Sequence, residues 1–241
     1  MRSAYLRHKL FILGFQVAAA LAVVNAEAQH FKWAPRNNPE FDRRKISYGF
    51  MIGLHTSMYE DKYSDAFVTQ SFDTVHSVQG SFTGGFSLGF LVNLRLHEML
   101  DLRILPKAGF YNHKLTYYYT DNTSTQQLVE TTMVEVPVLL KYKSMRRGNV
   151  RMYMVGGFTP GYEASGKNDA ETTQESIDVN RFNLTLDAGI GFDFYFPLFK
   201  LSQEIRFSRG LVNMLGSEPS IYNQPLQSMQ TNTIAVYFIF Q

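Results

Sequence analysis

The chain has 241 residues, no cysteine and a formal net charge of +2 at pH 7. The lack of cysteine excludes a disulfide scaffold, and beyond the N-terminus no run of about 18 apolar residues offers a transmembrane helix. Aromatic residues are nevertheless frequent, with 20 Phe and 14 Tyr. These features favour a protein built from β-strands.

The first 28 residues are predicted to be a secretory signal peptide. Arg2 and Arg7 give it a basic start, residues 10–24 are apolar, and Ala28 ends a small-residue cleavage site, so that Gln29 becomes the first mature residue. A transmembrane anchor is the alternative, but the apolar run is short for one. Cleavage brings the net charge close to zero, so the charge gives no argument for a nucleic acid partner.

Residues 29–45 are predicted to be an irregular N-terminal segment in the periplasm. They include Trp33, Pro35 and Pro39, show no regular period, and end in a basic cluster at 43–45. Residues 46–241 are predicted to form one barrel domain.

In eight segments of that domain, apolar residues alternate with polar residues or glycine. This is the pattern of a β-strand with one apolar and one polar face. The clearest is 181–196, where the even positions are wholly apolar and the odd positions are almost wholly polar or glycine. It is longer than most strands of soluble domains and suits a tilted crossing of a bilayer. Pro106 predicts a bulge or break in the third segment. The eight segments are residues 46–56, 81–96, 100–117, 129–143, 150–159, 181–196, 200–211 and 231–240.

The connections between these segments alternate between long polar loops and short turns. The short turns fall at 97–99, 146–149 and 197–198, and four long loops lie between the others. This asymmetry is typical of outer-membrane barrels with long external loops, and it predicts that both termini are periplasmic. An even number of strands closes without exposing an edge to lipid. The predicted fold is therefore an all-β, eight-stranded antiparallel transmembrane β-barrel in the outer membrane of a Gram-negative bacterium, with outer-membrane lipid around it.

The interior of such a barrel is only wide enough for its own side chains. Because buried charges must be paired, the charged residues at inward positions are interpreted as an ion-pair network that fills the lumen. A substrate conduit is the alternative, but the bore is narrow, and a general porin needs roughly 16 strands. The proposed network consists of Arg95, Asp101, Arg103, Lys107, Glu135, Lys141, Arg151, Asp187, Asp193, Glu204 and Arg206.

A catalytic site would have to come from His55, Ser57, Glu60 and His113, which the predicted strands place near the outer rim. Their spacing is not diagnostic, since a triad is recognised by geometry, and the histidines are interpreted as ordinary surface residues on loops. No metal-ligand spacing, phosphate-binding loop or nucleic-acid motif stands out. We therefore expect no enzyme activity, cofactor, metal or small-molecule substrate.

Several segments carry a more specific pattern. The most distinctive is residues 135–144, EVPVLLKYKS, followed by Tyr153 and a glycine pair at 156–157. Residues 39–42, 48–50, 101–106 and 204–208 add further matches in the same order. Together they resemble the PorT family of outer-membrane barrels, part of the type IX secretion and gliding machinery. The chain departs from that family in ending Phe240-Gln241, where Phe-Glu is usual, and in the composition of the loop after Tyr162.

The resemblance implies a component of the type IX protein secretion system, needed to export cargo proteins with C-terminal sorting domains across the outer membrane. Since the predicted bore is too narrow for cargo, the expected role is that of an accessory or assembly factor in contact with other secretion subunits. Two alternatives stay open. One is a structural or adhesin-like envelope barrel, and the other is a lipid-modifying outer-membrane enzyme.

Overall fold

The computed structural model describes residues 36–63, 75–120, 123–164, 179–216 and 226–241. The predicted signal peptide and residues 29–35 of the N-terminal segment lie outside these ranges. In the described part of the chain, no helix is long and apolar enough to cross a membrane.

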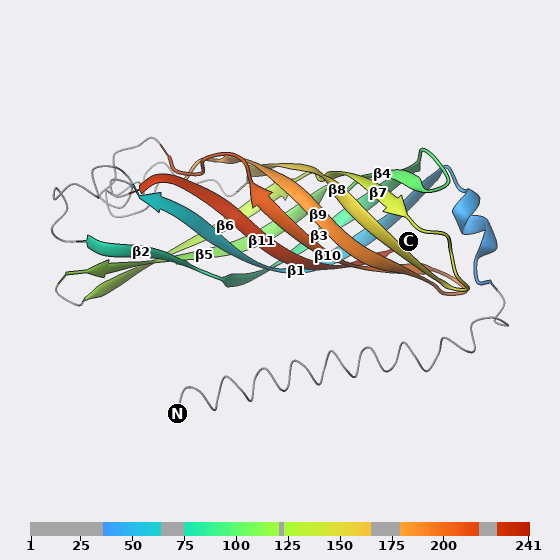
Figure 1. Cartoon of the computed structure of the whole chain (residues 1–241), viewed down its shortest axis with the longest axis horizontal. Coiled ribbons are helices and arrows are strands. Elements are labelled where there is room, and N and C mark those ends of the chain that lie inside the picture. Colours follow the sequence, from blue (N-terminus) through green and yellow to red (C-terminus); the bar gives the residue numbers. More distant parts are fainter. Residues whose placement is uncertain (1–35, 64–74, 121–122, 165–178, 217–225) are drawn as a thin grey trace, which may run out of the picture.

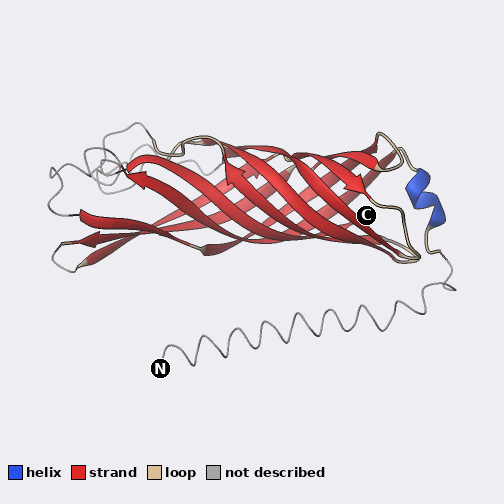
Figure 2. Cartoon of the chain, in the orientation of Figure 1, coloured by secondary structure: helices blue, strands red, loops and turns tan. Residues whose placement is uncertain are grey.

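The described residues form one short 3-10 helix followed by antiparallel strands (Figure 2). In chain order the elements are η1 (Pro39–Arg43), β1 (Ile46–Tyr63), β2 (Val75–Ser81), β3 (Thr83–Arg95), β4 (Leu100–Ile104), β5 (Lys107–Tyr119), β6 (Ser124–Glu135), β7 (Val138–Lys143), β8 (Val150–Glu163), β9 (Phe182–Tyr195), β10 (Lys200–Gly210) and β11 (Leu226–Phe240).

The strands close into a barrel (Figure 1). Pairing runs from β1 through β11, β10 and β9 to β8, and returns to β1 through β7, β4 and β3. The pairs β2/β3, β4/β5 and β6/β7 each follow one another with a gap of only one or two residues, so each pair makes one interrupted strand. Counted in this way, the ring has eight strands and the predicted fold is confirmed.

Prolines mark two of the interruptions. Pro106 separates β4 from β5, as predicted, and Pro137 separates β6 from β7, which was not predicted. Proline has no N–H to give to the ladder, but its carbonyl still accepts. Phe90 N–H donates to the Pro106 carbonyl at 2.9 Å, and Leu105 N–H donates to the Pro137 carbonyl at 3.0 Å. The neighbouring strands thus stay joined across the breaks.

Each strand has one apolar outer face and one buried inner face. On the outside, Phe90 is 72% exposed, and Phe50 stacks on Phe240 with ring centroids 4.9 Å apart. On the inside, Asp187 and Asp193 are buried although they alternate along β9 with exposed apolar residues. An exposed apolar belt around a polar interior is the arrangement expected where lipid replaces water outside.

The two ends of the barrel differ. We call the end with the connections 96–99, 144–149 and 196–199 the turn end, and the opposite end the loop end. The segment η1 lies at the turn end (Figure 1).

At the loop end, several strands run further than predicted. β1 continues to Tyr63, β2 and the start of β6 occupy residues predicted as loop, and only residues 120–123 connect β5 to β6. The prediction of a long loop between the third and fourth segments was wrong. Pairing between backbones continues beyond the apolar belt, where outward residues no longer need to be apolar, so the alternating pattern disappears while the strand persists.

Candidate functional site

The barrel interior holds most of the chemistry of this chain, beginning with a cluster at its centre. Arg103 and Glu204 form an ion pair at 2.6 Å, and both side chains are 0% exposed. Glu204 also accepts hydrogen bonds from Tyr153 Oη at 2.9 Å and from Arg206. Arg206 lies 4.0 Å from Asp187 in turn. A single carboxylate therefore neutralises two guanidinium groups.

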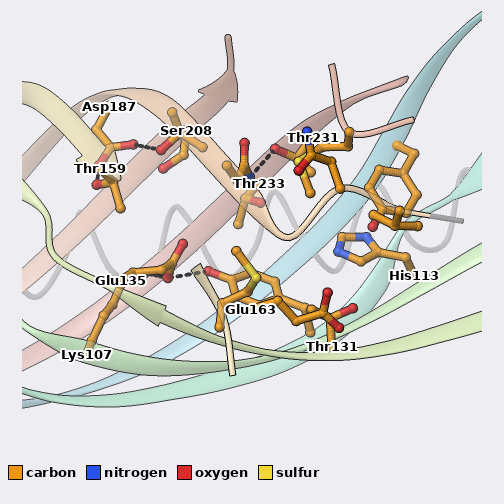
Figure 3. Close-up of a pocket in the computed structure, with 18 of the residues that line it drawn as sticks. Lys107, His113, Thr131, Glu135, Thr159, Glu163, Asp187, Ser208, Thr231 and Thr233 are labelled. Carbon is orange, nitrogen blue, oxygen red and sulfur yellow. Dashed lines mark hydrogen bonds and ion pairs between the residues drawn. The ribbon is translucent and has the colours of Figure 1, made fainter. Parts of the chain in front are cut away.

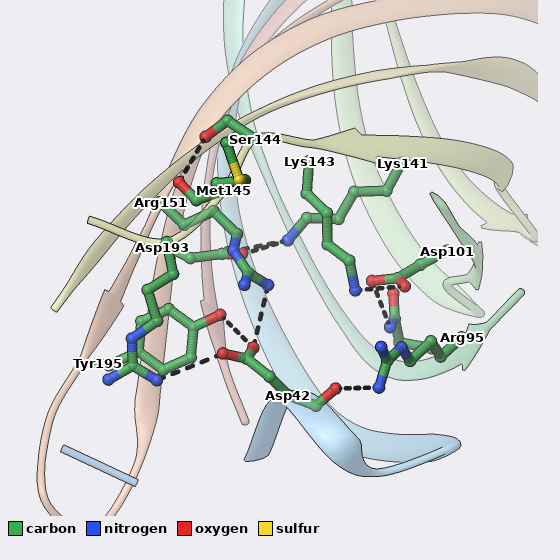
Figure 4. A network of polar contacts seen from close by, with 12 residues as sticks. Asp42, Arg95, Asp101, Lys141, Lys143, Ser144, Met145, Arg151, Asp193 and Tyr195 are labelled. Atoms are coloured by element: carbon green, nitrogen blue, oxygen red, sulfur yellow. Dashed lines mark hydrogen bonds and ion pairs between the residues drawn. The ribbon is translucent and has the colours of Figure 1, made fainter. Parts of the chain in front are cut away.

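A second group of ion pairs lies nearer the turn end (Figure 4). Lys141 Nζ donates to both carboxylate oxygens of Asp193, at 2.8 and 2.7 Å. Lys143 Nζ lies 2.6 Å from Asp101, which also accepts from Asn93 at 3.1 Å. Both lysines come from β7, where alternation turns them to the same inner face.

A third pair lies toward the loop end. Lys107 Nζ is 2.7 Å from Glu135, whose carboxylate also accepts from Tyr111 Oη at 2.8 Å. Lys107 further donates to Tyr237 Oη at 3.1 Å. Burial of these charges is offset because each has an opposite charge and a hydrogen bond.

Aromatic rings complete the interior. Lys141 Nζ lies 3.6 Å from the centroid of the Tyr153 ring, and the Arg206 guanidinium lies 4.4 Å from that of Tyr237. Such contacts add cation–π attraction to the ion pairs. Sequence reasoning missed both tyrosines as parts of this cluster, although their place on the inner face of β8 and β11 follows from the same alternation.

Arg95 and Arg151, the two remaining residues of the proposed network, make their contacts at the turn end. They hold Asp42, which belongs to η1. The Arg151 guanidinium is 3.0 Å from the Asp42 carboxylate, and Arg95 donates to the Asp42 backbone carbonyl. Sequence reasoning also missed Arg146, which reaches the same carboxylate at 3.4 Å.

The N-terminal segment closes the turn end through these contacts. Tyr195 Oη donates to Asp42 at 2.9 Å, and Phe41 is buried with its ring edge-on to Tyr195 at 6.1 Å. Asn37 bonds to the Asn149 side chain and to the Tyr195 carbonyl. The segment was predicted to be irregular; it instead contains a short helix fixed to the barrel, a feature too short to produce a periodic pattern.

The loop end is closed by apolar side chains. Tyr59, Leu115 and Met229 point inward from three strands and pack with Val179 and Met214 from the connections. Between this apolar cluster and the ion pairs lies a polar cavity of about 30 Å³, lined by Lys107, Glu135, Thr159 and Asp187 among others (Figure 3). Since one water needs roughly 10–15 Å³, the cavity has room for little more than solvent.

The catalytic candidates do not form a triad. His55 and His113 are each 4% exposed and lie inside the barrel, so the interpretation as surface residues on loops was wrong. Successive side chains of β1 and β5 still point alternately inward and outward at these positions, which keeps both histidines inside. Ser57 Oγ is 3.4 Å from His113 Nδ1, but Glu60 pairs instead with Arg209 at 3.1 Å. Among the described residues, no group of three or more potential metal ligands comes together.

Comparison with known proteins gives one family and several similar solved structures. A family described as "Outer membrane protein beta-barrel domain" matches residues 28–216. No curated protein matches. Similar solved structures include the outer membrane protein OprG from Pseudomonas aeruginosa, with 12% identity, 82% of this chain and 94% of that chain covered, and a TM-score of 0.48. Neisserial surface protein A has 10% identity, coverage of 81% and 98%, and a TM-score of 0.44. Ail of Yersinia pestis has 11% identity, coverage of 82% and 98%, and a TM-score of 0.35.

Proposed function

Because the chain belongs to the outer membrane protein beta-barrel domain family, and is thus a barrel of the Gram-negative outer membrane, we propose that it acts through contacts at its two ends and not as a pore. The observation that carries this proposal is the filled interior. Paired charges occupy the centre, η1 covers the turn end and an apolar cluster covers the loop end. A folded cargo protein has no path through such a lumen.

Within this class, we propose an accessory or assembly role in type IX secretion. Support comes from the resemblance of residues 135–144, 101–106 and 204–208 to the PorT family. Two lysines of the most distinctive block, Lys141 and Lys143, neutralise buried carboxylates of the interior. The role of this block is then to neutralise the lumen, and we propose that partners bind at another part of the barrel.

The proposed partner surface is the turn end. Its short connections and both described chain ends suggest that it faces the periplasm. Arg43, Arg44 and Lys45 are exposed there, on a segment that is fixed to the barrel by Asp42. An exposed basic cluster on a fixed segment suits a partner with an acidic surface. Other secretion subunits would dock at this end.

The test is site-specific crosslinking in intact outer membranes. A photo-crosslinking residue at Lys45 is expected to capture secretion subunits, whereas the same residue at Leu198, exposed in another connection of the turn end, measures background. Deletion of the gene is expected to leave sorting-domain cargo in the periplasm. Normal export in the deletion strain, together with no subunit captured at Lys45, would rule out the secretion role.

A second candidate function, an adhesin-like envelope barrel, is favoured by one observation. At the loop end, β2, β5 and β6 extend past the other strands (Figure 1). If the loop end is extracellular, this projection is a surface for external ligands. Normal cargo export combined with loss of surface attachment in the deletion strain would favour this function.

A lipid-modifying activity has weaker support from the geometry. Ser57 and His113 face the lumen and are buried, whereas lipid surrounds the outer face. Acyl chains or headgroups outside the barrel therefore have no access to this pair. We propose that the protein has no lipid-directed catalysis, and an unchanged lipid profile after His113→Ala in a folded barrel is the expected result.

A further inference from the structure

A small, positively charged cavity lies beneath the N-terminal segment. It has a volume of about 20 Å³ and is separate from the polar cavity near the loop end. Five cationic side chains and three carboxylates line it, an excess of two positive charges. The cations are Arg44, Arg95, Lys143, Arg151 and Lys200, and the carboxylates are Asp42, Asp101 and Asp193 (Figure 4 shows most of them).

Each of the three carboxylates already has a cation of its own. Asp101 is paired with Lys143 at 2.6 Å, and Asp42 with Arg151 at 3.0 Å. Asp193 is held on both oxygens by Lys141, which does not line the cavity. Each carboxylate therefore has a closer cation than Lys200, although Asp193 and Asp101 also attract Lys200 from a longer distance.

Arg44, Arg95 and Lys200 line the cavity without a carboxylate partner, and of these three Lys200 is the buried one. It is 4% exposed, and in the described part of the chain neither an ion pair nor a hydrogen bond engages its Nζ atom. Its contact is the face of the Phe41 ring, 4.4 Å from Nζ to the ring centroid. A ring face attracts a cation less strongly than a carboxylate in direct contact does, and a buried ammonium without a direct ion pair is destabilising.

We propose that the cavity binds one monoatomic, monovalent anion of about the size of chloride, with Lys200 as its main partner. The volume decides the class of ligand. One water-sized particle needs roughly 10–15 Å³, so about 20 Å³ accommodates a single halide but not phosphate or sulfate. Because Phe41 and Asp42 form one wall of the cavity, the binding site is complete only while the N-terminal segment is docked. Halide binding and docking of that segment therefore strengthen each other.

Bromide provides a direct test on the wild-type mature protein. Crystals of the refolded barrel soaked in sodium bromide are expected to give an anomalous peak inside the cavity, beside Lys200 Nζ. A chloride-containing crystal supplies the matched background. Bromide peaks on the outer surface alone, with none in the cavity, would overturn the proposal.

Protease sensitivity in solution gives an independent test. Trypsin cleavage after Arg43 and Arg44 is expected to be several-fold slower in chloride than in gluconate at equal ionic strength, since gluconate is too large for the cavity. Lys200→Met is expected to abolish the difference, and Lys62→Met, at an exposed lysine near the loop end, to preserve it. Equal cleavage rates of the wild-type protein in the two salts would overturn the proposal, whether or not Lys200→Met folds.

Discussion

At the scale of single residues, Glu204 is the most heavily shared charge in the barrel. It pairs with Arg103 and Arg206 and accepts from Tyr153. Removing its charge leaves Arg103 without an ion pair and leaves Arg206 with only Asp187, at 4.0 Å. Removing Arg103 leaves Glu204 still paired with Arg206. The two halves of the same ion pair are therefore unequal in their effect on stability.

We predict that Glu204→Gln lowers the free energy of unfolding by about 3–5 kcal/mol, the usual cost of breaking a buried pair, and that Arg103→Met lowers it less. Urea unfolding of the barrel in lipid vesicles, followed by the mobility shift on unheated SDS gels, measures both. Arg209→Met, in the exposed pair with Glu60, is the control and is expected to change stability by less than about 1 kcal/mol. A larger loss for Arg103→Met than for Glu204→Gln would contradict the shared role.

Glycine is required where an inner aromatic ring crosses a strand. Gly191 pairs with Tyr153 across β8 and β9, and a Cβ atom at Gly191 would lie 2.5 Å from the tyrosine ring. At Gly84 a Cβ atom would meet nothing within 4 Å.

We predict that Gly191→Ala destabilises the barrel by about 1–3 kcal/mol, as overpacking usually does, and that Gly84→Ala changes stability little. The same urea unfolding assay compares the two variants. Equal stabilities would mean that the Tyr153 ring and the Gln203 backbone carbonyl, 2.6 Å from the same Cβ position, both move aside without cost.

At the scale of elements, the N-terminal segment depends on a few polar contacts. Its Asp42 carboxylate is held by two arginines and a tyrosine, whereas the Glu40 carboxylate pairs only with the exposed Arg43. Of the two carboxylates, only that of Asp42 anchors the segment to the barrel, beside the contacts of Phe41 and Asn37. Its detachment is expected to leave the strands intact.

We predict that Asp42→Asn speeds trypsin cleavage after Arg44 several-fold without changing the mobility shift that reports the folded barrel. Glu40→Gln removes a neighbouring carboxylate that is exposed to solvent. Trypsin is expected to cleave this variant at the wild-type rate. Unchanged cleavage of Asp42→Asn would mean that Phe41 and Asn37 hold the segment without the carboxylate.

The elements also show where sequence reasoning succeeds and where it stops. Alternation identified all eight strands, because an apolar outer face is obligatory in lipid. It missed β2 and the start of β6, because strands outside the apolar belt do not need an apolar outer face. It placed the charged residues on inner faces but not their partners. Arg103 and Glu204 are 101 positions apart, and which residues meet across a barrel depends on strand tilt and stagger.

At the scale of the whole molecule, the barrel is closed in three successive layers. The turn end has η1, the centre has the ion pairs and the loop end has the apolar cluster around Tyr59. Removing one layer leaves the other two in place. Ion conduction should therefore be absent even when the N-terminal segment is deleted.

We predict that both the wild-type mature protein and a variant lacking residues 29–44 show no stepwise conductance in planar bilayers. A porin inserted under the same conditions serves as the positive control. Discrete conductance steps in the deletion variant would mean that the N-terminal segment alone seals the lumen.

The pairing of the first strand with β11, which closes the barrel, affects how the protein can be assembled. β1 pairs with β11 from Phe50 opposite Phe240 to Tyr63 opposite Leu226, so the first strand finds its second neighbour only after β2 to β10 have been translated. The ring therefore cannot close while the chain is still emerging from the ribosome or the export channel. Whatever escorts the polypeptide to the membrane must keep an amphipathic, incomplete sheet from aggregating until β11 arrives.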